Sequence, residues 1–262
     1  MTQQSIELGI CVTPEQAPLV AAHYDYLELA LSTALDPLVD DATFASTMAS
    51  LMNLPLPVRA CNNFVNPRVR LVGPEVDWHL IERYIRRGFA RAEALGVELI
   101  VFGSGGARMV PDDMAREEAW LQLVSFCQHC SDHAYPGLVL AIEPLNQGEC
   151  NIINSYEEGV ALARDVDRTN VQVLADIYHF EVESEPVEDI SEGSELLAHV
   201  HLADSGRLYP GSGSYPLREW FELLHELGYD QRASVECTWG DDFAAEAQAA
   251  AEFLRPLTRG EF

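Results

Sequence analysis

The chain has 262 residues, a length that suits one large domain better than two small ones. Its 42 acidic residues against 16 basic ones give a formal net charge of −26. Because a surface this negative repels the phosphate backbone of nucleic acids, we expect no nucleic-acid partner. All 16 basic residues are arginine because the sequence contains no lysine, which excludes the usual forms of Schiff-base aldolases, pyridoxal-phosphate enzymes and P-loop NTPases.

The sequence has no run of about 18 apolar residues that would span a membrane, and its N-terminus lacks the basic and then apolar regions of a secretion signal. We therefore expect a cytoplasmic protein with no membrane partner. Cys127 and Cys130 have the spacing of a metal-binding or redox pair. They lie in a helical pattern, however, and the sequence has no second such pair, so we expect their side chains to pack in the core.

Eight short apolar runs are predicted strands; they cover residues 6–12, 26–31, 57–62, 97–102, 138–143, 171–176, 198–203 and 233–237. Amphipathic segments alternate with them, and the helices predicted most clearly cover residues 78–95, 112–133, 156–166, 217–227 and 242–254. Eight strands with a helix after each predict a single (β/α)8 TIM barrel over residues 1–262.

A doubly wound open sheet is the competing architecture. Its nucleotide-binding form needs a glycine-rich turn after the first strand, where this chain has Val12-Thr-Pro-Glu-Gln. The acidic stretch 181–195 is typical of a solvated connection with a short helix.

The last four predicted strands each end at or near a residue that can bind a metal ion. Two of them finish Leu-Ala-Ile-Glu143 and Val-Leu-Ala-Asp176, and the others contain His199-Val-His201 and Ser-Val-Glu236. Any one of these residues could instead be a helix cap, half of an ion pair or a core histidine. Their recurrence on consecutive strands, whose ends are neighbours in a barrel, predicts one divalent-metal site. The predicted ligands are Glu143, Asp176, His201 and Glu236.

His199 and His201 share one face of their strand because side chains alternate. His201 lies nearer the C-terminal end, where a barrel carries its site, so we expect His199 one layer deeper and hydrogen-bonded within the barrel. Three carboxylates and one imidazole make an oxygen-rich site, which favours Mn²⁺ or Mg²⁺, with Co²⁺ or Zn²⁺ able to substitute; Mn²⁺ is the first expectation.

At these residues the sequence resembles the xylose isomerase-like sugar isomerase and epimerase superfamily, in particular its D-tagatose 3-epimerase, D-psicose 3-epimerase and hydroxypyruvate isomerase branch. The similar motifs are Ala141-Ile-Glu143-Pro-Leu-Asn146, Leu174-Ala-Asp176-Ile-Tyr-His179 and His199-Val-His201-Leu-Ala-Asp-Ser-Gly-Arg207, followed by Glu236. The resemblance implies a divalent-metal cofactor, a sugar or keto-acid substrate, and dimers or tetramers, which are common among such relatives.

The resemblance also implies roles for single residues. Glu143 and Glu236 would exchange a proton beside a carbonyl as base and acid, while the metal stabilises the enediolate. The residues expected to contact substrate are Glu149, His179 and Arg207. Their ordinary alternatives are a solvated loop position, a helix-start hydrogen bond and a surface ion pair.

Several positions depart from the resemblance. Gln147 stands where many relatives carry arginine, Cys150 stands where threonine is common, and the loop 211–215 lacks an Asp-aromatic pair. The metal site is therefore predicted to be intact, while the sugar is not identified. The loop Phe102-Gly-Ser-Gly-Gly-Ala-Arg108 also resembles the family, and Arg108 with Arg207 leaves a phosphorylated substrate open.

Three other functions are weighed against a sugar isomerase or epimerase. A lyase, dehydratase or C-glycoside-processing member of the superfamily also begins by removing a proton beside a carbonyl. An endonuclease IV-like hydrolase needs extra histidine ligands and a basic face, which the charge of the chain opposes. A barrel subunit without activity is disfavoured because both predicted acid/base glutamates are present.

Overall fold

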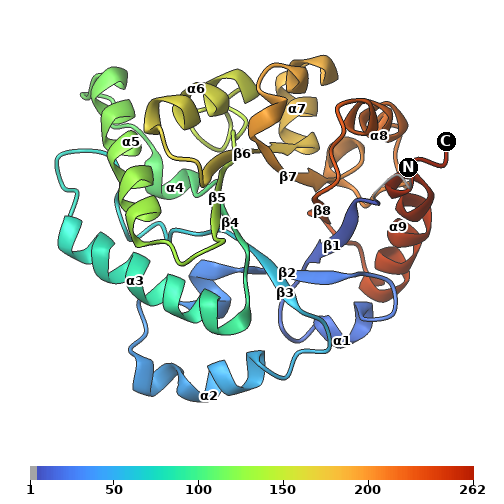
Figure 1. Cartoon of the computed structure of the whole chain (residues 1–262), viewed down its shortest axis with the longest axis horizontal. Coiled ribbons are helices and arrows are strands. Elements are labelled where there is room, and N and C mark those ends of the chain that lie inside the picture. Colours follow the sequence, from blue (N-terminus) through green and yellow to red (C-terminus); the bar gives the residue numbers. More distant parts are fainter. Residues whose placement is uncertain (1–4) are drawn as a thin grey trace.

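The computed structural model describes residues 5–262, so the first four residues of the predicted domain lie outside the described residues. Eight parallel strands close into a barrel, each paired with its neighbours in sequence and the eighth with the first (Figure 1). The strands are β1 (Glu7–Cys11), β2 (Tyr26–Ala30), β3 (Val58–Asn62), β4 (Leu99–Phe102), β5 (Val139–Ile142), β6 (Val171–Asp176), β7 (Leu197–Leu202) and β8 (Arg232–Val235). The predicted (β/α)8 TIM barrel is confirmed.

Helices form a layer around the barrel (Figure 1). The described α-helices are α1 (Ala17–Val20), α2 (Asp41–Leu51), α3 (Trp78–Leu95), α4 (Gly105–Arg108), α5 (Arg116–His133), α6 (Tyr156–Val166), α7 (Ile177–Glu183), α8 (Leu217–Glu226) and α9 (Phe243–Thr258). Other helical turns complete the described helical structure; they are the π-helical η1 (Leu31–Leu35) and the 3-10 helices η2 (Val187–Ser191), η3 (Ser194–Leu196) and η4 (Ser205–Arg207).

Local chemistry sets the helix limits. The Asp77 carboxylate caps α3 by accepting hydrogen bonds from the backbone N–H groups of His79 and Leu80, both at 3.0 Å. Gly96 ends α3 in the left-handed region at a φ of 77°, which glycine adopts without a steric penalty. The bounds predicted for α3 and α6 are those observed.

Two helices start later than predicted. α9 begins at Phe243 rather than residue 242 and continues to Thr258 rather than residue 254. α5 begins at Arg116 rather than residue 112, because Met114 N–H donates to Pro111 O at 3.0 Å and closes a turn there. Cys127 and Cys130 are buried free thiols within α5, as the packing interpretation predicted.

The barrel interior changes character along the strands. Tyr26, Ala141 and Leu174 belong to one buried apolar cluster, and each is followed two positions later by an acidic residue. Since alternate residues of a strand face the same side, an apolar layer gives way to a charged layer toward the C-terminal end. The Tyr26 hydroxyl also pairs with Ser234 Oγ at 2.8 Å within the barrel.

The acidic stretch 181–195 contains the end of α7, the short helix η2 and the start of η3, in agreement with a connection that holds a short helix. Within it, Glu185 is half-buried and accepts a hydrogen bond at 2.7 Å from the backbone N–H of Tyr156 at the start of α6. Burial raises the pKa of this carboxyl group from 4.5 to about 7, and the neighbouring Asp189 and Glu183 add to the rise.

We predict that Glu185→Gln stabilises the protein at alkaline pH. A folded-state pKa above the unfolded one means that the folded state binds the extra proton, so wild-type stability falls as pH rises from 4.5 through 7. The glutamine amide oxygen can still accept the hydrogen bond from Tyr156 N–H, and an amide does not ionise, so the variant does not lose stability as the pH rises. After allowance for solvent screening, we expect the variant to be more stable than the wild type by about 1 kcal/mol at pH 8. Calorimetric unfolding at pH 8 and pH 5 measures the gain; an equal effect at both values would contradict the prediction.

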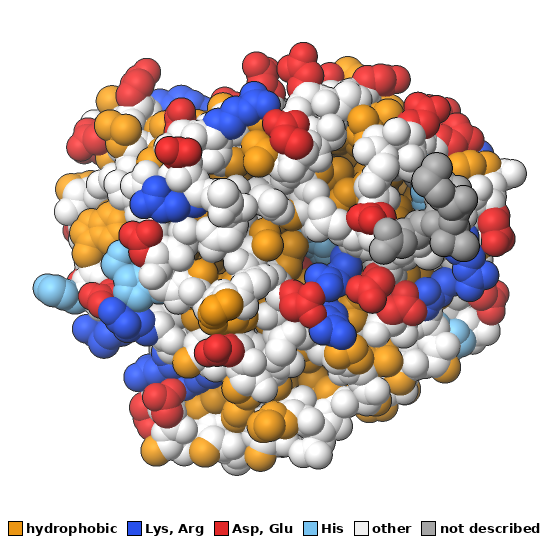
Figure 2. All heavy atoms as spheres, viewed as in Figure 1, with side chains coloured by type: hydrophobic (Ala, Val, Ile, Leu, Met, Phe, Trp, Pro, Cys, Tyr) orange, Lys and Arg blue, Asp and Glu red, His pale blue; other side chains and the backbone are white. Residues whose placement is uncertain are grey.

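The acidic excess lies on the surface. On the face seen in Figure 2, acidic side chains lie along the rim and also near the centre, with arginines among them. Arg232 contacts both Glu7 and Glu98, and Arg255 contacts Asp25. No helix within residues 5–262 is long and apolar enough to cross a membrane.

Candidate metal centre

The four predicted ligands meet at the C-terminal end of the barrel. Asp176 is the last residue of β6 and His201 lies near the end of β7. Glu143 and Glu236 each stand one residue beyond β5 and β8, where the chain has just left the sheet, whereas the sequence placed them inside the strands. One ligand atom from each of the four lies within 4.8 Å of the others.

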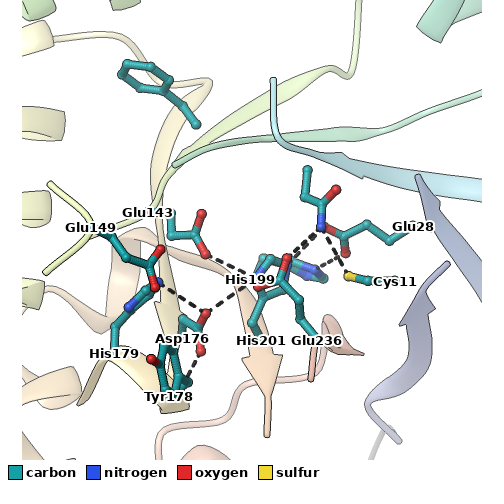
Figure 3. A network of polar contacts seen from close by, with 12 residues as sticks. Cys11, Glu28, Glu143, Glu149, Asp176, Tyr178, His179, His199, His201 and Glu236 are labelled. Carbon is teal, nitrogen blue, oxygen red and sulfur yellow. Dashed lines mark hydrogen bonds and ion pairs between the residues drawn. The ribbon is translucent and has the colours of Figure 1, made fainter. Parts of the chain in front are cut away.

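His201 is the centre of the cluster (Figure 3). Its Nδ1 lies 3.2 Å from Glu143 Oε1, 3.4 Å from Glu236 Oε2 and 4.0 Å from Asp176 Oδ2. The imidazole is fully buried, so water does not screen it from the carboxylates around it.

Asp176 has one oxygen committed and one free. Its Oδ1 accepts a hydrogen bond at 2.8 Å from the backbone N–H of Tyr178 and so caps α7. Its Oδ2 is buried and accepts no hydrogen bond within the described part of the chain, and His179 Nε2 lies 3.6 Å away from it. A buried carboxylate oxygen without a partner is costly, and a cation held by the four residues removes that cost.

The pKa shifts describe the same need for positive charge. Burial raises the pKa of Asp176, and the nearby Glu236 and Glu143 carboxylates raise it further against the opposing effect of His179. Burial disfavours a charged His201, yet Glu28 and Glu236 raise the pKa of its imidazole well above the usual range. Three carboxylate groups and one imidazole are a donor set that suits a divalent-metal cofactor at this position.

The loop after β4 makes room for Glu143. A Cβ atom at Gly103 would stand 2.0 Å from Glu143 Oε2, so only glycine leaves space for the carboxylate there. Arg108, at the end of α4, is fully buried and donates to the backbone oxygens of Phe102 at 3.0 Å and Glu143 at 2.8 Å. Arg108 therefore holds the end of β5 and is not available to a substrate phosphate.

His179 faces the cluster from the first turns of α7. The backbone N–H of Asn146 donates to His179 Nδ1 at 3.1 Å, which leaves Nε2 to carry the proton on the side of Asp176. The loop after β5 thus fixes the orientation of the ring. Gln147, next in that loop, is exposed and bonded to Glu183 instead of facing the cluster.

Arg207 joins the rim of the site to its interior. Its guanidinium lies 3.0 Å from Glu236 Oε2 and 3.3 Å from Glu149 Oε1, and it stacks over the Tyr178 ring at 4.5 Å. The backbone of Arg207 has a φ of 63°, a left-handed conformation that is strained for arginine. The three residues predicted to contact substrate therefore lie beside the four predicted metal ligands. They are His179, Arg207 and Glu149, of which Glu149 is the most exposed.

Sequence reasoning missed two polar residues that support the cluster from β2 and β3. Asn62 donates through Nδ2 to Glu236 Oε1 at 2.6 Å. Glu28 is fully buried and contacts both His199 and His201 at 2.9 Å, so the expected hydrogen bond of His199 within the barrel is present. The available signal was a lone acidic residue within the apolar run Tyr26-Leu-Glu-Leu-Ala30. Burial holds back its ionisation, but His201 and His199 keep the pKa of Glu28 below its usual range.

Comparison with known proteins agrees with the fold. The chain matches the family described as xylose isomerase-like TIM barrel over residues 22–257. It belongs to this family. The D-psicose 3-epimerase of Agrobacterium fabrum is 37% identical over 101 residues, a stretch that covers 38% of this chain and 35% of that protein. The chain therefore aligns with about a third of the length of this curated relative.

Two solved structures have the same fold at lower identity. The D-psicose 3-epimerase of Clostridium cellulolyticum H10, crystallised with D-tagatose, matches with a TM-score of 0.83 at 23% identity, over 97% of this chain and 99% of that one. A protein named IOLI, crystallised with a bound zinc atom, matches with a TM-score of 0.70 at 19% identity, over 98% of both chains.

We predict that Asp176→Asn removes metal binding while leaving α7 capped, because the amide oxygen can still accept from Tyr178 N–H. For the wild type, a divalent ion at about 100 times its dissociation constant adds about 2.7 kcal/mol of stability. In a chain of this size that raises the melting temperature by about 5 °C. Thermal unfolding with MnCl₂ and with EDTA measures the difference, and an equal rise in the variant would contradict the prediction.

Proposed function

We propose that this protein is a divalent-metal-dependent sugar isomerase or epimerase that moves a proton on the carbon beside a carbonyl group. The observation that carries the proposal is the meeting of Glu143, Asp176, His201 and Glu236 within 4.8 Å at the C-terminal end of a TIM barrel. The relatives named as epimerases support the same reaction class.

The two glutamates are the proposed acid and base. They stand after β5 and β8, so they approach the centre from the two ends of an arc of four strands. Glu236 is held at both oxygens, by Asn62 and by Arg207, and this fixes the direction of its carboxylate. A substrate between the two glutamates can lose a proton to one and regain it from the other.

Asp176 and His201 are the proposed ligands that complete the metal site, and Mn²⁺ is the proposed ion. An oxygen-rich donor set favours Mn²⁺ or Mg²⁺, although the zinc bound by the IOLI protein keeps Zn²⁺ among the alternatives. When bound, the cation acts as a Lewis acid that stabilises the negative charge developing on the substrate oxygens.

The remaining polar residues are proposed to bind the sugar. The Nε2–H of His179 and the guanidinium of Arg207 are donors that can orient hydroxyl or carbonyl oxygens, and Glu149 can accept from a hydroxyl. An unphosphorylated substrate fits these groups best, since Arg108 is buried and Arg207 already contacts two carboxylates.

We predict that Glu143→Gln and Glu236→Gln each slow turnover by about 10³-fold or more while the fold persists, because an amide cannot take up the proton. The Mn²⁺-loaded protein is incubated in deuterated water with a panel of ketoses and hydroxypyruvate. NMR follows the loss of the carbon-bound proton and the appearance of an epimer or aldose. Exchange of the carbon-bound proton at the wild-type rate in either variant would contradict the two-glutamate mechanism.

The matched control is Glu157→Gln, an exposed glutamate in the first turn of α6, which should exchange at the wild-type rate. The same spectra separate the competing reactions. Loss of water or cleavage of a carbon–carbon bond would replace isomerisation with a lyase. Tight substrate binding with no conversion would indicate a barrel without activity.

A further inference from the structure

Glu28 is a buried charge whose position the proposed reaction does not explain. It lies on β2, on the opposite side of His201 from Glu143 and Asp176 (Figure 3), and its side chain is fully buried. Each of its oxygens is used by one imidazole: Oε1 lies 2.9 Å from His201 Nε2, and Oε2 lies 2.9 Å from His199 Nε2.

These contacts determine where the protons stand. An ionised carboxylate can only accept hydrogen bonds, so both imidazoles must carry a proton on Nε2. In His201 this leaves Nδ1 for the other side of the ring, where Glu143 and Glu236 oxygens lie at 3.2 and 3.4 Å. A bare nitrogen lone pair facing carboxylate oxygens is repulsive, so this side of the ring requires a positive charge, either a proton or a metal ion.

We propose that Glu28 is a positioning residue of the metal centre. It holds the His201 ring in one orientation and keeps its proton on Nε2, so that Nδ1 is presented to a divalent cation. The proposal rests on the proposed function above, and it assigns Glu28 no contact with substrate. A metal-binding histidine commonly donates its other ring N–H to a carboxylate, and loss of that partner costs about 10- to 100-fold in metal affinity.

His199 completes the arrangement as the second anchor of Glu28. Because it takes up Oε2, the carboxylate cannot rotate away from His201 without breaking a buried hydrogen bond. His199 is itself fully buried, and its Nδ1 has no hydrogen-bond partner in the described part of the chain, so its interaction with Glu28 is the polar contact that orients it. His199 thus orients Glu28, Glu28 orients His201, and His201 presents Nδ1 to the metal position.

A purely structural ion pair is the competing explanation, and it predicts a different result. Removing such a pair lowers the melting temperature but leaves metal affinity and the state of the His201 ring unchanged. A positioning role changes both. The test therefore reads metal affinity and a histidine signal in place of turnover.

The principal variant is Glu28→Gln, which keeps the shape but offers a single acceptor to two N–H donors. Its control is Tyr26→Phe, two residues earlier on β2, which removes a buried hydrogen bond to Ser234 inside the same barrel. Titration with Co²⁺, followed by visible absorption, gives the affinity. NMR of ¹⁵N-histidine-labelled, Zn²⁺-loaded protein detects the His201 Nε2 proton. We expect Glu28→Gln to bind Co²⁺ about 10- to 100-fold more weakly and to lose or shift this proton signal, and Tyr26→Phe to match the wild type.

Wild-type affinity and an unchanged Nε2 proton in Glu28→Gln would overturn the proposal. If that variant does not fold, Glu28→Asp decides the question, because it keeps the charge but withdraws the carboxylate by one methylene group from the two rings. Weaker Co²⁺ binding supports positioning, and wild-type binding overturns it. Failure of the wild-type protein to bind Co²⁺ would instead overturn the metal centre itself, so the two failures are distinguishable.

Discussion

The arrangement of residues at the C-terminal end of this barrel depends on the balance of charge around His201. Glu143, Asp176 and Glu236 bring three carboxylates to one largely buried point, where water screens their charge only weakly. One Asp176 oxygen has no hydrogen-bond partner in residues 5–262. The positive groups beside the cluster are the His201 imidazole, which Glu28 also contacts, and the Arg207 guanidinium, which contacts Glu236. A divalent cation bound at this point would offset much of this negative charge, and the proposed proton transfer needs the same ion.

The barrel around this point is arranged to hold the carboxylates in place. Below them an apolar layer that includes Tyr26 and Leu174 fills the interior. At their own level, Glu28 takes the far side of His201, and Asn62 and Arg207 hold the two Glu236 oxygens. Glu28 and Asn62 lie on strands, which are more rigid platforms for a site than free loops, and Arg207 lies in η4 beyond β7.

Sequence patterns predicted the architecture and the four clustered residues because both follow short-range rules. Alternating apolar runs and amphipathic segments define a barrel, and parallel strands in a barrel bring their C-terminal ends together. Glu143 and Glu236 could therefore be expected near Asp176 and His201 without a structure. The roles of these residues in binding and catalysis go beyond that geometry and stay proposals.

Supporting contacts were beyond the sequence because they depend on tertiary packing. Glu28 precedes His201 by 173 residues, and nothing local indicates that β2 brings it to the far side of that ring. Arg108 lay in a glycine-rich loop that suggested substrate contact, yet it is buried against two backbone oxygens. Strand limits also shifted by one residue at Glu143, where the chain turns out of the sheet.

The most direct test of a cation at this point is anomalous diffraction from crystals soaked in MnCl₂. Data collected at the manganese absorption edge should give one strong anomalous peak among Glu143, Asp176, His201 and Glu236, within coordination distance of His201 Nδ1. Soaked wild-type crystals that give no anomalous peak at this position, or a peak beside other residues instead, would contradict the charge balance on which the proposed function depends.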